Sequence, residues 1–126
     1  LFNPMNILAY KFNDLYFSQT LFYGGLLMAS NMIWSHQIVH FLSNGHFNKY
    51  IFFIGIILSI LISIFLRQQL YINDNQWLKR MISHHSTALT TSHKILNKTN
   101  NPRINKLATE IINTQMNEIE LMKSML

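Results

Sequence analysis

Residues 50–66 have the sequence YIFFIGIILSILISIFL, an apolar run that ends just before Arg67. A helix that is apolar on every side must be surrounded by protein or by lipid. Only 12% of the 126 residues are charged, against about 25% in ordinary soluble domains. So few charges cannot coat the surface of a soluble globule. We therefore expect residues 50–66 to cross a bilayer, near the short end of the spanning range.

A second candidate span precedes it. Residues 21–42 carry no formal charge and are long enough to cross a bilayer. Their polar side chains are expected to face protein or a cavity, because lipid cannot satisfy them. A short polar loop around Gly45 joins the two spans, which predicts a transmembrane hairpin over residues 21–67. Residues 1–20 mix aromatic and polar side chains, which is typical of a segment at the lipid headgroups.

The remaining residues, 68–126, have the pattern of an extramembrane helical hairpin. Charges return there, and apolar residues recur three and four positions apart. Asn73 or Asp74 can cap the first helix, and Asn101 followed by Pro102 is a typical helix start. The predicted fold class is all-α, with two transmembrane helices followed by an antiparallel helical hairpin. We expect no strand, and helices over residues 21–42, 50–70, 74–97 and 102–125.

Several functional classes are disfavoured by composition and motifs. The chain has no cysteine, so it forms neither a disulfide nor a thiolate metal site. Its net charge of +5 accompanies 49% hydrophobic residues and no basic cluster, which favours lipid headgroups over nucleic acid as its partner. The sequence contains no zinc-protease motif, nucleophile elbow or phosphate-binding loop, so we do not expect an enzyme.

The strongest local feature is MISHH, residues 81–85. If the last two helices fold back at a turn near residue 101, the numbers of facing residues sum to about 203. Met81 then faces Met122, His85 faces Glu118, and Ala88 faces Gln115. We name the resulting set of candidate metal ligands the Met/His cluster: Met81, His84, His85, Gln115, Glu118 and Met122.

A site of imidazole and thioether donors without cysteine favours copper, and soft sulfur favours Cu(I). The alternative is that the methionines are ordinary core residues. A second stripe recurs every four residues along the first span. It is either a helix-packing surface or a row of soft ligands along a metal route through the membrane, and it consists of Met28, Met32, His36 and His40.

The last 50 residues resemble a known family. MISHHSTALTTSHKIL, followed by NPRINKLATEIINTQMNEIELMKSML, is similar to the domain of unknown function 305 family, and the upstream segment resembles its membrane-anchored branch. This resemblance implies a ferritin-like helical hairpin and copper bound by the two helix faces that carry the Met/His cluster. The chain departs from the family pattern at Ser83, where proline is expected, and at His93, where an acidic residue is expected.

These features predict an integral membrane protein that binds copper for storage, buffering or handover. The alternative is a small structural subunit of a larger membrane assembly without a metal role, and haem held by histidines of the spans is a third possibility. Because two helices bury little apolar surface, we expect a homo-oligomer or other membrane subunits to cover Ile82, Leu89 and Leu107. The basic residues flanking the spans favour a cytoplasmic hairpin, whereas the family's exported domains favour the opposite side.

Overall fold

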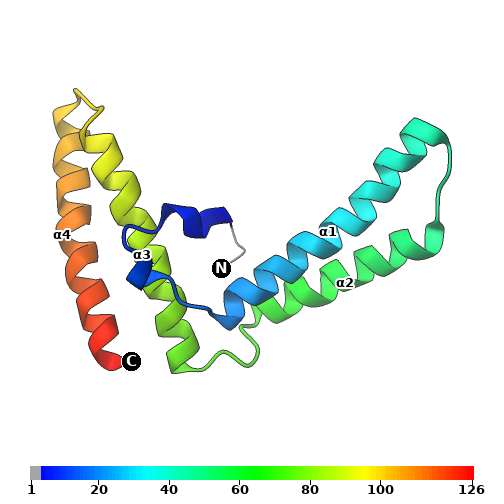
Figure 1. The fold of residues 1–126 in the computed structure, drawn as a ribbon, viewed down its shortest axis with the longest axis horizontal. Helices are drawn as coiled ribbons and strands as arrows, with labels where there is room; N and C mark the ends of the chain where they lie inside the picture. The colour runs from blue at the N-terminus through cyan, green and yellow to red at the C-terminus, as the bar shows by residue number, and fades with distance from the viewer. Residues whose placement is uncertain (1–3) are drawn as a thin grey trace. The chain divides into compact units, whose positions relative to one another are not determined.

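The computed structural model describes residues 4–126 and contains no strand within that range, which confirms the all-α prediction (Figure 1). The chain divides into two compact units. Residues 19–72 form one, and the segment up to Ser18 together with Asn73–Leu126 forms the other. The elements in chain order are the 3-10 helices η1 (Pro4–Leu8) and η2 (Phe12–Asp14), and the helices α1 (Gln19–Asn44), α2 (Lys49–Arg67), α3 (Asp74–Leu96) and α4 (Pro102–Met125).

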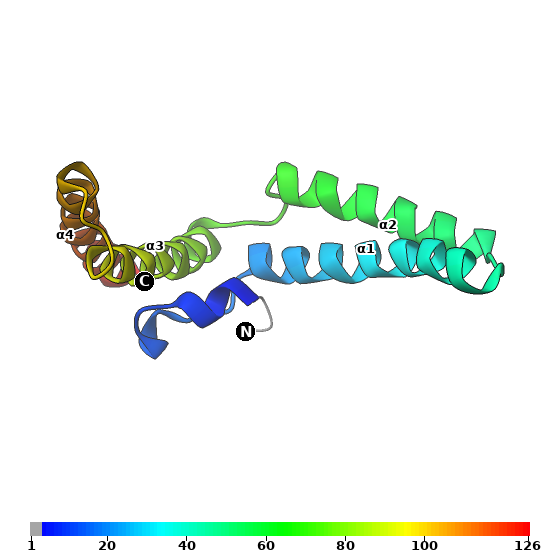
Figure 2. The ribbon, with the colours of Figure 1, turned by 90° about the horizontal axis from the view of Figure 1, so that it is seen from above.

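Helices α1 and α2 form an antiparallel hairpin and run side by side in both views (Figures 1 and 2). Gly55 of α2 is buried against α1, where an added Cβ would lie 3.0 Å from both the backbone nitrogen and the Cβ of Trp34. Ser59, one turn later, is also buried and donates a hydrogen bond to the Gly55 carbonyl over 2.9 Å. Small residues on this face therefore allow the close approach of the two helices.

Helix α2 ends at Arg67, three residues before the end predicted for it. Gln69 adopts a left-handed backbone with φ of 50°. Its N–H donates to the carbonyl of Leu66, and the N–H of Leu70 donates to the carbonyl of Phe65. This pair of hydrogen bonds is the Schellman arrangement that closes a helix. The sequence did not reveal it, because glycine usually occupies the left-handed position.

Within residues 4–126, α2 is the one helix that is long and apolar enough to cross a membrane, as judged from length and composition. Helix α1 is longer, at 26 residues, but does not meet the same criterion. Its polar residues, among them Asn31, Gln37 and His40, lower its hydropathy. The structure therefore supports one of the two predicted spans.

Helices α3 and α4 form the second hairpin, and their caps agree with the sequence. The Asn73 side chain accepts from the N–H of Gln76 at 2.9 Å, and the Asn101 side chain accepts from the N–H of Arg103 at 3.0 Å. Pro102 occupies the first turn, where its missing N–H costs nothing. The hydrophobic core between the helices consists of Leu78, Ile82, Leu89, Ile112, Ile119 and Met122.

Residues 4–18, which we name the N-terminal strap, pack against α3. The N–H of Tyr10 donates to the Ser86 hydroxyl at 2.8 Å, and the Ser83 hydroxyl donates to the Asp14 carbonyl oxygen at 2.8 Å. The predicted domain division, with residues 1–20 as a separate interfacial segment, missed this packing. A role at the lipid headgroups remains a prediction.

The expectation that another chain covers Ile82 and Leu89 is wrong for both residues. Ile82 is 0% exposed and Leu89 is 3% exposed within this chain alone. Both belong to the hairpin core, and Tyr16 of the strap packs against that core. The strap thus covers part of the apolar surface of the α3–α4 hairpin that we expected a partner chain to cover. Leu107, at 53% exposed, remains open.

Candidate metal centre

The facing surfaces of α3 and α4, here called the seam, bring part of the Met/His cluster together. His85 Nδ1 lies 3.0 Å from Glu118 Oε2, so the predicted pairing of these two residues is confirmed. Gln115 Nε2 lies 3.3 Å from the same carboxylate oxygen and donates to it. The amide therefore helps to fix the carboxylate beside the imidazole.

The two methionines of the cluster also belong to the seam. Met122 is 7% exposed and is a member of the hairpin core. Met81 is half-buried and packs against that same core. Their placement agrees with the predicted helix register. It fits a core residue and a soft metal ligand equally well.

The imidazole of His85 has an unusual environment. Its Nδ1 is buried and makes no hydrogen bond, although Glu118 Oε2 lies 3.0 Å away. A buried ring nitrogen normally has a hydrogen-bond partner or a metal ion. Beside this pair, the seam also contains the methionines Met81 and Met122, and imidazole and thioether are both donors that copper accepts.

His84 is the exception within the cluster. It is exposed on α3, since adjacent residues of a helix point about 100° apart. Its ring centroid lies 6.1 Å from that of His85. Partial burial, the Arg80 cation and His85 together lower the pKa of His84. The ring therefore stays neutral, and able to bind a metal, to a lower pH than an ordinary histidine.

The four side chains of the stripe on α1 are spaced along the helix and do not surround one common point. Met28, Met32 and His36 are exposed, and His40 is half-buried. The rings of His36 and His40 have their centroids 6.0 Å apart. A metal route along this stripe remains a prediction.

Across residues 4–126, no three side chains of His, Asp or Glu are placed to hold a metal ion by themselves. At the seam, His85 and Glu118 are two such side chains.

Sequence reasoning missed a buried charge in the same unit. Asp14 of the strap is 2% exposed, forms an ion pair with Lys123 of α4, and accepts from the Ser86 hydroxyl at 2.6 Å. A hollow of about 140 Å³ lies beside this ion pair. The sequence carries one signal that could have drawn attention to this residue, since Asp14 is the one acidic residue before Asp74.

Fold and site together define an all-α protein with one candidate membrane helix and a helical hairpin whose seam carries Met, His and Glu. The family model described as Domain of unknown function (DUF305) matches residues 67–126. "Uncharacterized protein L153" of Acanthamoeba polyphaga mimivirus is 40% identical to this chain, over 98% of this chain and 81% of that protein. No solved structure matches. The chain belongs to the DUF305 family, as its motifs predicted.

Proposed function

We propose that this chain is a membrane-anchored copper-binding protein that stores, buffers or hands over Cu(I). The observation that carries the proposal is the 3.0 Å approach of the buried His85 Nδ1 to Glu118 Oε2. Met81 and Met122 belong to the same seam, so sulfur donors are available there. We propose a binding protein and not an enzyme.

In this proposal each residue of the seam has a separate task. Met81, His85 and Met122 bind the ion, and His84 joins them as a ligand from the exposed side of α3. Glu118 orients the imidazole or binds the ion directly, and Gln115 holds the carboxylate in place through its hydrogen bond. The bound Cu(I) ion would then pass to a partner protein whose sulfur ligands bind it more tightly.

Membrane anchoring is the second part of the proposal. Helix α2 is long and apolar enough to cross a bilayer, and α1 packs along it. We propose that α1 crosses the bilayer as a second span and turns its polar residues towards protein, so that the ferritin-like α3–α4 hairpin lies outside the membrane. A homo-oligomer or another membrane subunit would then cover the polar residues of α1.

The test is a competition between the full chain, in detergent micelles, and a chromophoric Cu(I) chelator. The double variant Met81→Leu/Met122→Leu nearly preserves volume, so the hairpin should fold. It removes both sulfurs, and we expect its affinity for Cu(I) to fall at least about tenfold, while its affinity for Zn²⁺ changes little. His85→Ala should weaken binding of both metals.

A matched control is Met116→Leu/Met125→Leu, because both of these methionines are exposed on α4, at 41% and 57%. The control should bind Cu(I) as the wild type does. Equal Cu(I) affinity in the wild type and in the Met81→Leu/Met122→Leu variant would contradict the proposal. The methionines would then be core residues, and a structural subunit without a metal role would be the better conclusion.

A further inference from the structure

The turn between α1 and α2 has a fixed shape. Helix α1 ends at Asn44, and Gly45 adopts a left-handed backbone with φ of 71°. The N–H of Gly45 donates to the carbonyl of Phe41 at 2.9 Å, which closes the helix. A residue with a Cβ would be strained at this position. The backbone conformation of Gly45 therefore sets the direction in which the chain leaves α1 at His46.

Side chains anchor the turn on both helices. The Phe47 ring lies 5.7 Å from the ring of Phe41 and 5.2 Å from the ring of Phe52. The N–H of Asn48 donates to Gln37 Oε1 at 3.3 Å, and the Asn48 side chain accepts from the N–H groups of Tyr50 and Ile51 in the first turn of α2. These contacts keep the loop close to the last turns of α1.

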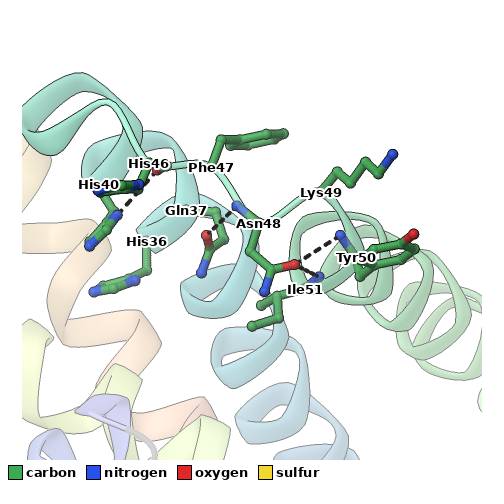
Figure 3. A pocket seen from close by; sticks show the side chains of 9 residues that line it. All are labelled: His36, Gln37, His40, His46, Phe47, Asn48, Lys49, Tyr50 and Ile51. Atoms are coloured by element: carbon green, nitrogen blue, oxygen red, sulfur yellow. Dashed lines mark hydrogen bonds between the residues drawn. The ribbon is translucent and has the colours of Figure 1, made fainter.

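The anchored loop brings three imidazoles together from two elements (Figure 3). His36 and His40 lie one turn apart on α1, with ring centroids 6.0 Å apart. The ring of His46 lies 6.4 Å from that of His40. The three residues line a hollow of about 650 Å³ at the end of the hairpin.

The central ring contacts a backbone carbonyl through one of its nitrogens. His40 Nδ1 lies 3.2 Å from the carbonyl oxygen of His46. A carbonyl oxygen only accepts, so this contact is a hydrogen bond when Nδ1 carries a proton, and metal binding would then use Nε2. A backbone carbonyl on the second ring nitrogen is also the usual support of a metal-binding histidine.

Charge around the hollow is compatible with a cation. Lys49 is the one cationic residue in its lining, and its Nζ lies 5.4 Å from the centre of the Tyr50 ring. In Figure 3 the Lys49 side chain extends away from the three histidines. The lining contains neither sulfur nor a carboxylate, in contrast to the seam.

We propose that His36, His40 and His46 form a second metal site at this turn, which takes a borderline divalent ion such as Zn²⁺. Nitrogen donors without sulfur favour divalent Zn²⁺ or Cu²⁺ over Cu(I). With Zn–N distances of about 2.0–2.1 Å, the centroids of two rings on one ion lie roughly 5–6 Å apart. The rings do not yet meet at one point, but His36 and His46 are exposed. Small side-chain rotations therefore close the site around the ion.

The experiment must separate this site from the seam. We would use the full chain in detergent micelles, with His84→Gln/His85→Gln as the background, so that the seam imidazoles are absent. Zn²⁺ affinity and stoichiometry are measured by competition with a chromophoric chelator. The background should bind one Zn²⁺, and adding His40→Gln or His46→Gln should lower the affinity at least about tenfold.

His93→Gln in the same background is the control, because His93 belongs to the other unit, and it should leave the Zn²⁺ affinity unchanged. His46→Gln decides the outcome if His40→Gln reduces helicity by circular dichroism, since His46 lies outside both helices. Unchanged Zn²⁺ affinity in His46→Gln would overturn the proposal, as would an equal loss in His93→Gln. A failure here would leave the Cu(I) result at the seam unaffected.

Discussion

Replacing Asp14 by Asn removes the charge that attaches the N-terminal strap to the hairpin. The carboxylate is 2% exposed, accepts from the Ser86 hydroxyl and forms an ion pair with Lys123. Asparagine keeps the size of the side chain but can accept at one atom only. The variant therefore leaves either the Lys123 ammonium or the Ser86 hydroxyl facing a second donor.

The expected loss follows from these contacts. A hydrogen bond to a charged group contributes about 1.5–3 kcal/mol, and removing one partner of a buried ion pair costs about 3–5 kcal/mol. The Lys123 side chain is 31% exposed and can turn towards water, so the low end applies. We expect about 3 kcal/mol of strap docking to be lost, which raises the undocked population roughly 100-fold.

Amide hydrogen exchange measures that population directly. The N–H groups of Tyr10 and Tyr16 bond to hydroxyls of α3 and are free only when the strap undocks. Their exchange should accelerate roughly 100-fold in Asp14→Asn, and at least as much in Lys123→Met, which leaves the buried carboxylate unpaired. Asp74→Asn, an exposed acid of α3, is the control and should not change it. Equal exchange in the wild type and Asp14→Asn would refute the reasoning.

Two further predictions concern single contacts. Gly55→Ala places a methyl group about 3.0 Å from the backbone of Trp34 and should destabilise the α1–α2 hairpin by about 1–3 kcal/mol in thermal unfolding in detergent. Gly25→Ala, where nothing lies within 4 Å, should not, and equal effects would contradict the packing argument. Arg80→Gln removes a cation that lowers the pKa of His84, so the pKa should rise towards 6.5 in an NMR titration. Arg103→Gln is its control, and an unchanged pKa of His84 in Arg80→Gln would contradict the contribution assigned to the Arg80 cation.

The sequence predicted well whatever depends on local pattern. The helices begin and end close to the expected residues because apolar period, caps and Pro102 act within a few residues. The pairing of His85 with Glu118 followed from the position of one turn, since a short connection fixes which residues of two antiparallel helices face each other. The predicted end of α2 was wrong because Gln69 adopts a left-handed backbone conformation that is uncommon for glutamine.

Family membership, the all-α class and the α3–α4 register were thus determined by the sequence alone, through motifs and short-range geometry. Only the tertiary structure decided that the strap docks on α3, that Asp14 is buried with Lys123 across 109 residues, and that His46 joins His36 and His40. These contacts depend on where a loop or an irregular segment comes to rest. Contacts with side chains of other elements fix where such a segment lies, and these contacts leave no periodic pattern in the sequence.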